Sequence, residues 1–171
     1  LTESAKLLAQ WDRRYTKDNT RAVLFEEAMR ELNNRTWDEL TETGTATRRV
    51  ATPGSAVLLE LMADSSSVWW DDHVTSQVEQ RDDILAMSLV AALQNSKRQH
   101  GSPDSGGWRW DRIRFHNIDH LLRLAPFGAD SIPAQGGTGT LNPSLGTGHH
   151  GPSWRFVVEM GPSVRAWATY P

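Results

Sequence analysis

The chain has 171 residues, of which 38% are hydrophobic and 23% charged, with a formal net charge of −3 and no cysteine. These values are typical of one soluble globular domain and exclude the fibrous and disordered classes, and the lack of cysteine excludes thiol catalysis, cysteine-bound zinc and disulfides. The longest nearly unbroken apolar stretch, residues 85–93, is about half of the ~18–20 residues of a membrane-spanning helix. Because the sequence also lacks a stripe of Lys and Arg for a phosphate backbone, we expect neither a membrane nor a nucleic-acid partner.

The two ends of the sequence indicate a piece of a longer protein. Leu1 is neither a Met nor part of a signal peptide, and Tyr170 and Pro171 stop within an apolar run. We therefore expect the chain to be a fragment of a larger domain.

Helical periodicity dominates the first part of the chain and predicts a helical region over residues 1–100. Four patterns in this region predict the start of a helix: Thr2 or Ser4, Asn19 or Thr20, the capping-box pattern Thr36–Glu39, and Thr52-Pro53. A second capping-box pattern, Ser76–Glu79, predicts the start of the longest helix, which ends at about His100. The apolar positions that define the buried faces are Leu7, Leu8 and Trp11; Ala22, Phe25, Met29 and Leu32; and Val57, Leu58 and Leu61.

Glycine, proline and tryptophan replace this periodicity in residues 101–152, which we predict as a loop region. Residues 106–124 within it are compatible with a strand or a short helix. Alternating apolar residues on both sides of Gly161-Pro162-Ser163 predict an antiparallel hairpin over residues 153–171. The expected fold class is α+β, mainly helical with a C-terminal antiparallel β-hairpin, and all three regions belong to one larger domain.

Two motifs carry candidate chemistry. His116 and His120 are spaced to share one helical face, with Asp119 beside the second histidine, as in reversed zinc-protease motifs that carry Glu at that position. This pattern suggests either the metal site of a hydrolase or histidines that are hydrogen-bonded in a partly buried segment. Residues 146–151 have the letters GxGxxG, but a proline and a strand follow them instead of a helix, so we assign no dinucleotide. The sequence also lacks a GxSxG elbow, and residue types alone therefore identify no active site.

Three stretches in the last third of the chain resemble the late β chain of the penicillin acylase family of N-terminal-nucleophile amidohydrolases. They are Trp110–Ile113 with His120 ten residues after the tryptophan, Gly136–Pro143, and Gly151–Met160 followed by Ala166–Pro171. Residues 8–12 and Leu24-Phe25 are similar to the start of the family's late helical region. Arg114 stands where the family commonly has a histidine.

The resemblance implies an αββα architecture and an enzyme that hydrolyses linear amide bonds of penicillins or related N-acyl compounds. Its nucleophile is a Ser at the start of the β chain, whose own α-amino group serves as base while an Asn holds the oxyanion. These residues and the structural calcium ligands of the family precede the matched part, so we expect no activity and no cofactor for this fragment alone. The implied partners are the rest of the β chain, the α chain and a small N-acyl substrate, in the periplasm or outside the cell, with the cytoplasm as the alternative.

Glu159 is the one candidate site residue that the resemblance assigns within the chain. It is similar in position to a carboxylate of the late β strand that, in cephalosporin acylases among others, pairs with a histidine near the nucleophile. The other interpretation is a Glu at the surface or at the edge of a sheet. Two alternatives to the acylase also stay open: a non-catalytic helical interaction module, and a metal-dependent hydrolase that uses His116, Asp119 and His120.

Overall fold

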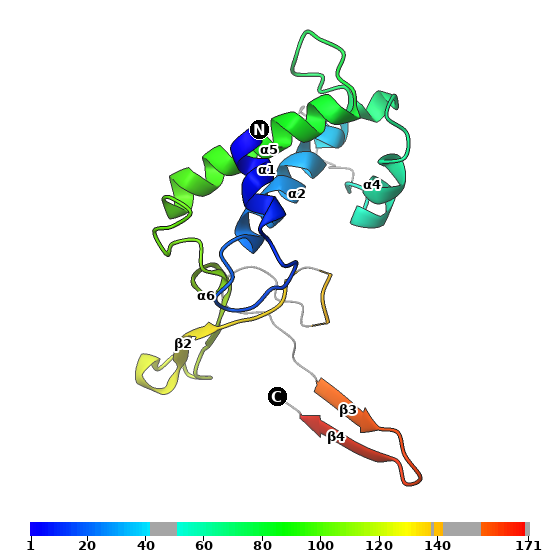
Figure 1. Ribbon diagram of the computed structural model, residues 1–171. Helices are drawn as coiled ribbons and strands as arrows, with labels where there is room; N and C mark the ends of the chain where they lie inside the picture. The colour runs from blue at the N-terminus through cyan, green and yellow to red at the C-terminus, as the bar shows by residue number, and fades with distance from the viewer. Residues whose placement is uncertain (42–50, 138, 142–154, 170–171) are drawn as a thin grey trace. The chain divides into compact units, whose positions relative to one another are not determined.

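The computed structural model describes residues 1–41, 51–137, 139–141 and 155–169 (Figure 1). Within these residues the secondary structure is α+β, with six α-helices, two short 3-10 helices and two antiparallel sheets of two strands each. This confirms the α+β class. The chain forms two compact units, residues 1–12 with 21–105 and residues 13–20 with 106–171. The division into regions 1–100, 101–152 and 153–171 stays a prediction.

The first unit is helical. Its elements are α1 (Thr2–Ala9), α2 (Ala22–Thr36), α3 (Asp38–Thr41), α4 (Ser55–Leu61), the 3-10 helix η1 (Val68–Trp70) and α5 (Arg81–His100). Helix α5 packs along α2 and also contacts α1. The buried Ser4 hydroxyl of α1 donates a hydrogen bond to the carbonyl of Leu89 in α5 over 2.9 Å. None of the helices in the described part of the chain combines the length and the hydrophobicity that a membrane span requires.

An apolar cluster joins α2, α4 and α5 to the loop between α4 and α5. Its buried members are Leu32, Trp37, Leu58, Trp70 and Ile84. The Trp70 indole also donates to the carbonyl of Asp64 over 2.6 Å, so its polar N–H is satisfied inside the cluster. The periodic positions Leu32 and Leu58 thus lie in the core, as the helical spacing predicts. Val57, predicted on the same buried face as Leu58, is 46% exposed.

Both predicted capping boxes are wrong. Thr36 is the last residue of α2, and its hydroxyl donates to the carbonyl of Leu32 over 2.8 Å instead of capping α3. Helix α5 begins at Arg81 with a capping box formed by Gln80 and Asp83. The carboxylate of Glu79, predicted to close the box with Ser76, accepts hydrogen bonds from the Asp72 amide and the Thr75 hydroxyl in the preceding loop.

The other predicted helix starts are shifted by one to three residues. Helix α1 begins after Leu1, with Ser4 in its interior, α2 begins after Arg21 rather than after Thr20, and α4 begins after Gly54 rather than at Pro53. None of these three caps has a side-chain hydrogen bond to the helix. Packing of the apolar faces, rather than capping chemistry, therefore sets these boundaries.

In its described residues, the second unit contains a short α-helix, a 3-10 helix and four strands. Its elements are α6 (Trp110–Ile113), β1 (Phe115–Ile118), the 3-10 helix η2 (Ala125–Phe127), β2 (Ala129–Pro133), β3 (Arg155–Glu159) and β4 (Arg165–Thr169). Strands β1 and β2 pair antiparallel, with Phe115 opposite Pro133 and an irregularity between His116 and Ile118. Part of the region predicted as loop is thus a small sheet, and residues 106–124 contain both a helix and a strand.

Strands β3 and β4 form the predicted antiparallel hairpin. The register runs from Arg155 opposite Thr169 to Glu159 opposite Arg165. The stretch 134–141 has no helix or strand in its described residues, while the rest of the predicted loop to residue 152, with the GxGxxG motif, lies outside the described residues.

Candidate functional site

The Trp110 side chain is buried in the second unit and contacts several of its segments. It is only 1% exposed, and its indole N–H donates to the carbonyl of Gly136 over 2.7 Å. The ring of Tyr15 meets it edge-on with centroids 5.1 Å apart, and the Arg114 guanidinium lies 5.3 Å from the ring centre. Two of the stretches that carry the family resemblance, 110–113 and 136–141, are therefore held together by one buried tryptophan.

The segment 13–20 reinforces this arrangement through backbone hydrogen bonds. The Trp110 and Asp111 amides donate to the carbonyls of Asn19 and Lys17, each over 2.8 Å, and the Gly136 amide donates to the carbonyl of Tyr15 over 2.9 Å. The start of α6 is thereby fixed in position, although the helix has only four residues.

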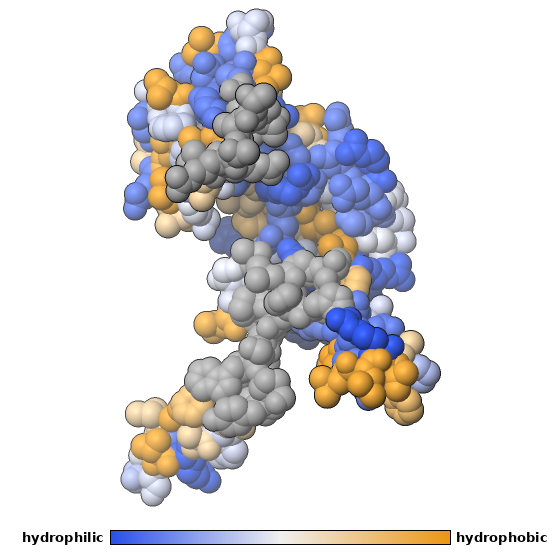
Figure 2. All heavy atoms as spheres, turned by 180° about the vertical axis from the view of Figure 1, so that it is seen from behind, coloured by the Kyte–Doolittle hydropathy of each residue, from blue (hydrophilic) through white to orange (hydrophobic). Residues whose placement is uncertain are grey.

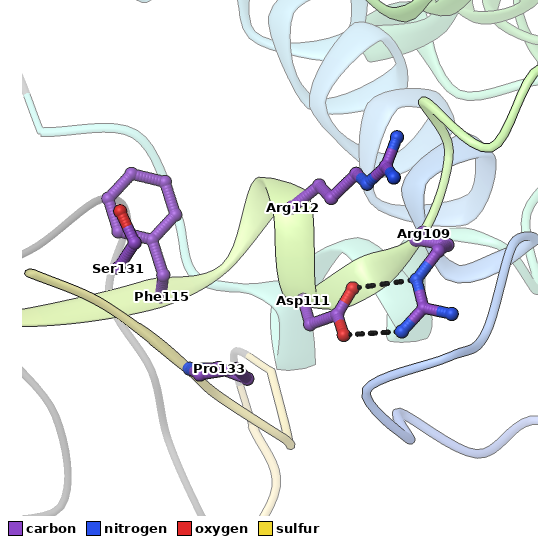
Figure 3. Close-up of a pocket in the computed structure, with 6 residues that line it drawn as sticks. All are labelled: Arg109, Asp111, Arg112, Phe115, Ser131 and Pro133. Atoms are coloured by element: carbon purple, nitrogen blue, oxygen red, sulfur yellow. Dashed lines mark hydrogen bonds and ion pairs between the residues drawn. The ribbon is translucent and has the colours of Figure 1, made fainter.

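A pocket of about 460 Å³ lies beside α6 (Figure 3). Its lining comes from three places in the sequence: Arg109, Asp111 and Arg112 at α6, Phe115 at the start of β1, and Ser131 and Pro133 on β2. Phe115 and Pro133 are partners in the β1–β2 register, so strand pairing builds the apolar side of the pocket.

An ion pair forms the polar side of the pocket. Arg109 donates two hydrogen bonds to Asp111, over 3.0 Å from Nε and 2.6 Å from Nη2. These hydrogen bonds hold the pKa of the Asp111 carboxyl below its ordinary value and raise the pKa of Arg109. Because Asp111 is paired with Arg109 through two hydrogen bonds, it is poorly suited to act as a general base. The described residues that line the pocket include no histidine. The lining thus combines an engaged ion pair with an apolar wall.

The predicted helical arrangement of His116, Asp119 and His120 is wrong. His116 lies in strand β1 opposite Ile132, and the two later residues follow the strand, because residues 129–133 supply a strand partner for 115–118. The Asp119 carboxylate pairs with Arg123, and His120 Nδ1 accepts the Leu122 amide over 3.3 Å. In the described part of the chain, no group of three His, Asp or Glu side chains is placed to hold a metal ion.

Glu159 ends strand β3 and forms an ion pair with Arg165 across the hairpin, at 2.7 Å. Its side chain is 51% exposed, and the Arg165 guanidinium lies 5.9 Å from the centre of the Trp167 ring. The alternation of the strand puts Glu159 on the face opposite Phe156 and Val158. Its role in a reaction stays a prediction.

Sequence reasoning missed the pocket. Asp111 and Arg112 were part of the resembling tryptophan segment, but Arg109, Phe115, Ser131 and Pro133 were not singled out as site residues. Strand pairing brings Ser131 and Pro133 to α6, and no local pattern in residues 129–133 signals it.

Comparison with known proteins identifies the family. The sequence profile of the family described as penicillin amidase matches residues 1–171. Two similar proteins are the acyl-homoserine lactone acylases QuiP of Pseudomonas fluorescens (strain Pf0-1) and Pseudomonas syringae pv. syringae (strain B728a), which are 32% identical over 109 and 113 residues. These matches cover 60% and 61% of this chain and 13% of each relative, so the chain spans a small part of the length of these relatives. The chain belongs to the penicillin amidase family.

Proposed function

We propose that the chain is part of an amide hydrolase that removes the acyl group from N-acyl-homoserine lactones or from related N-acyl compounds such as penicillins. The observation that carries this proposal is the family match over residues 1–171, together with two relatives whose names specify acyl-homoserine lactone acylases. The overall reaction adds water to the amide bond and releases a carboxylic acid and a free amine.

In this proposal the reacting groups lie elsewhere in the polypeptide. An N-terminal Ser of the mature β chain attacks the amide carbonyl, its own α-amino group takes the proton, and an Asn with backbone N–H groups holds the oxyanion. Residues 1–171 serve as a scaffold, with the β3–β4 hairpin joining the sheet of an αββα architecture. The α chain and the rest of the β chain are the partners, structural calcium is bound outside this segment, and the enzyme acts in the periplasm or outside the cell.

The test starts from the natural polypeptide. We would purify from the source cells the protein that contains residues 1–171, determine its mass and N-terminal residue, and incubate it with N-acyl-homoserine lactones and penicillin G. We expect a longer chain that begins with Ser and releases the free acid and amine, detected by mass spectrometry. A mature chain that begins near Leu1 and releases neither product would overturn the proposal in favour of an interaction module. Stoichiometric zinc, with activity lost on chelation, would instead indicate a metal-dependent hydrolase.

Glu159 can be tested in the same assay with a matched control. Glu159→Gln and Arg165→Gln both break the ion pair of the hairpin, but only the first removes the carboxylate. If Glu159 positions a histidine at the nucleophile, Glu159→Gln lowers kcat by about a hundredfold or more and alters the pH profile, whereas Arg165→Gln leaves both nearly unchanged. Equal losses in the two variants would assign Glu159 to hairpin stability alone.

A further inference from the structure

The pocket beside α6 has the size and the two-sided character of a small-molecule site. Its volume of about 460 Å³ falls within the roughly 300–1,000 Å³ typical of such sites. Figure 3 shows Arg109, Asp111 and Arg112 toward one end, and Phe115 with Ser131 toward the other. The lining is therefore polar and charged at one end and partly aromatic at the other.

The charged end has one positive charge in excess. Arg109 and Asp111 neutralise each other through two hydrogen bonds. Arg112 and Lys17 both act through space on Asp111, and Asp18 acts on Arg109, so the charges of Lys17 and Asp18 also cancel. Arg112 carries the remaining charge, since no hydrogen bond or ion pair joins its guanidinium to another side chain in the part of the chain that the structure describes.

The arginines at this end have unused hydrogen-bonding capacity. Arg109 uses two of its five N–H groups for Asp111. Arg112 is exposed and has several rotatable bonds, so its planar fork can turn over the pocket and bind a carboxylate with two parallel hydrogen bonds. The positive charge of Arg112 attracts an anionic ligand, whereas a neutral amide is attracted less and an ammonium group is repelled.

We propose that this pocket binds a monocarboxylate with an apolar body. The carboxylate is held by Arg112 and the outer N–H groups of Arg109, and the apolar body lies against Phe115 and Pro133. The acid that the proposed hydrolysis releases belongs to this chemical class, but binding in the pocket does not depend on that reaction.

The test compares three probes with the same six-carbon chain: hexanoate, hexanamide and hexylamine. Each is titrated into the natural polypeptide that contains residues 1–171, labelled with ¹⁵N, and amide shifts are followed by NMR. Hexanoate is expected to shift the amides of Phe115 and Ser131 in a saturable way and to bind about tenfold more tightly than hexanamide. Hexylamine is expected to bind more weakly still.

Two arginine substitutions test whether Arg112 binds the carboxylate of hexanoate. Arg112→Gln is expected to weaken hexanoate binding about tenfold or more, while leaving the weaker hexanamide binding nearly unchanged. Arg123→Gln is the matched control, because Arg123 is also an exposed arginine of the second unit but does not line the pocket. This control should bind hexanoate as the unaltered chain does.

Three results would overturn the proposal: equal affinity for hexanoate and hexanamide, stronger binding of hexylamine, or hexanoate shifts that are unchanged in Arg112→Gln. Hydrolysis is measured on the natural polypeptide in a separate assay, so the two proposals fail independently. An enzyme that cleaves N-acyl-homoserine lactones but shows no hexanoate site would retain the proposed function and lose the carboxylate pocket.

Discussion

Replacing Trp110 by Phe should loosen the second unit locally and leave the first unit unchanged. The buried indole joins α6 to the loop at Gly136 through its N–H, and its ring lies against Tyr15. Phe keeps an aromatic ring at this position but removes the donor and part of the ring volume. The carbonyl of Gly136 then loses its side-chain partner, while the backbone hydrogen bond from the Gly136 amide to Tyr15 remains.

The size of the effect follows from two losses. The hydrogen bond from a buried N–H contributes about 1 kcal/mol, and the incomplete filling of the space left by the indole costs about 1 kcal/mol more, a fraction of the ~3–5 kcal/mol for truncation of Trp to Ala. The sum of about 2 kcal/mol corresponds to roughly a thirtyfold increase in the population of the locally opened state.

Hydrogen exchange followed by mass spectrometry measures the population of the locally opened state directly. Peptides from residues 106–116 and 134–137 should exchange about thirtyfold faster in Trp110→Phe, whereas peptides from α2 and α5 should be unaffected. Trp69→Phe is the matched control, since Trp69 is 36% exposed and meets Trp37 edge-on at 5.3 Å, and its effect should stay below about 1 kcal/mol. Equal acceleration in both units, or none at Gly136, would refute the role assigned to Trp110.

Two further predictions concern the core and the ion pair. In urea unfolding, Leu58→Ala should lower the free energy of unfolding by about 3 kcal/mol, because the side chain is 1% exposed in the apolar cluster. The control Leu59→Ala, in the same helix but 66% exposed, should lower it by less than about 1 kcal/mol. Similar losses in the two variants would contradict the core assignment. The pKa of Asp111 is lowered by Arg109, so its contribution to stability is fully present above the ordinary carboxyl pKa and is lost as the pH falls through the lower folded value. Asp111→Asn should therefore flatten the loss of stability of the second unit as the pH falls below the ordinary carboxyl pKa. The loss should not disappear, because Asp18 also has a lowered pKa. An unchanged pH dependence would contradict this.

Elements with strong local periodicity were predicted correctly from the sequence, whereas their ends were not. The long helix and the C-terminal hairpin carry apolar residues that repeat at helical and at strand spacing, respectively. A capping pattern consists of two residues and recurs by chance: Thr36 bonds back to its own helix, and Glu79 is held by the preceding loop. The actual box uses Gln80 in place of Ser or Thr, because its side chain also reaches the backbone N–H of Asp83.

The candidate pocket shows a second limit of sequence reasoning. The pocket exists because Phe115 and Pro133 become partners although eighteen positions separate them in the chain. The same pairing makes His116 a strand residue and removes the helical face on which the predicted metal site depended. Local spacing cannot reveal such non-local pairing, so the histidines carried a stronger signal in the sequence than the residues that line the pocket.

The two faces of the β3–β4 hairpin bear on the proposed role of Glu159. On one face Phe156 and Val158 lie opposite Ala168 and Ala166, so this face is wholly apolar. A two-stranded hairpin is marginally stable alone in water, and an apolar face gains free energy only when something covers it. In the proposed larger domain this face packs into the core, which turns Glu159 and its partner outward to the opposite face. Arg165 engages one carboxylate oxygen of Glu159, so the other oxygen is the one that a histidine near the nucleophile would meet on that face. The Glu159→Gln and Arg165→Gln comparison therefore separates a positioning role of the carboxylate from its role in the hairpin.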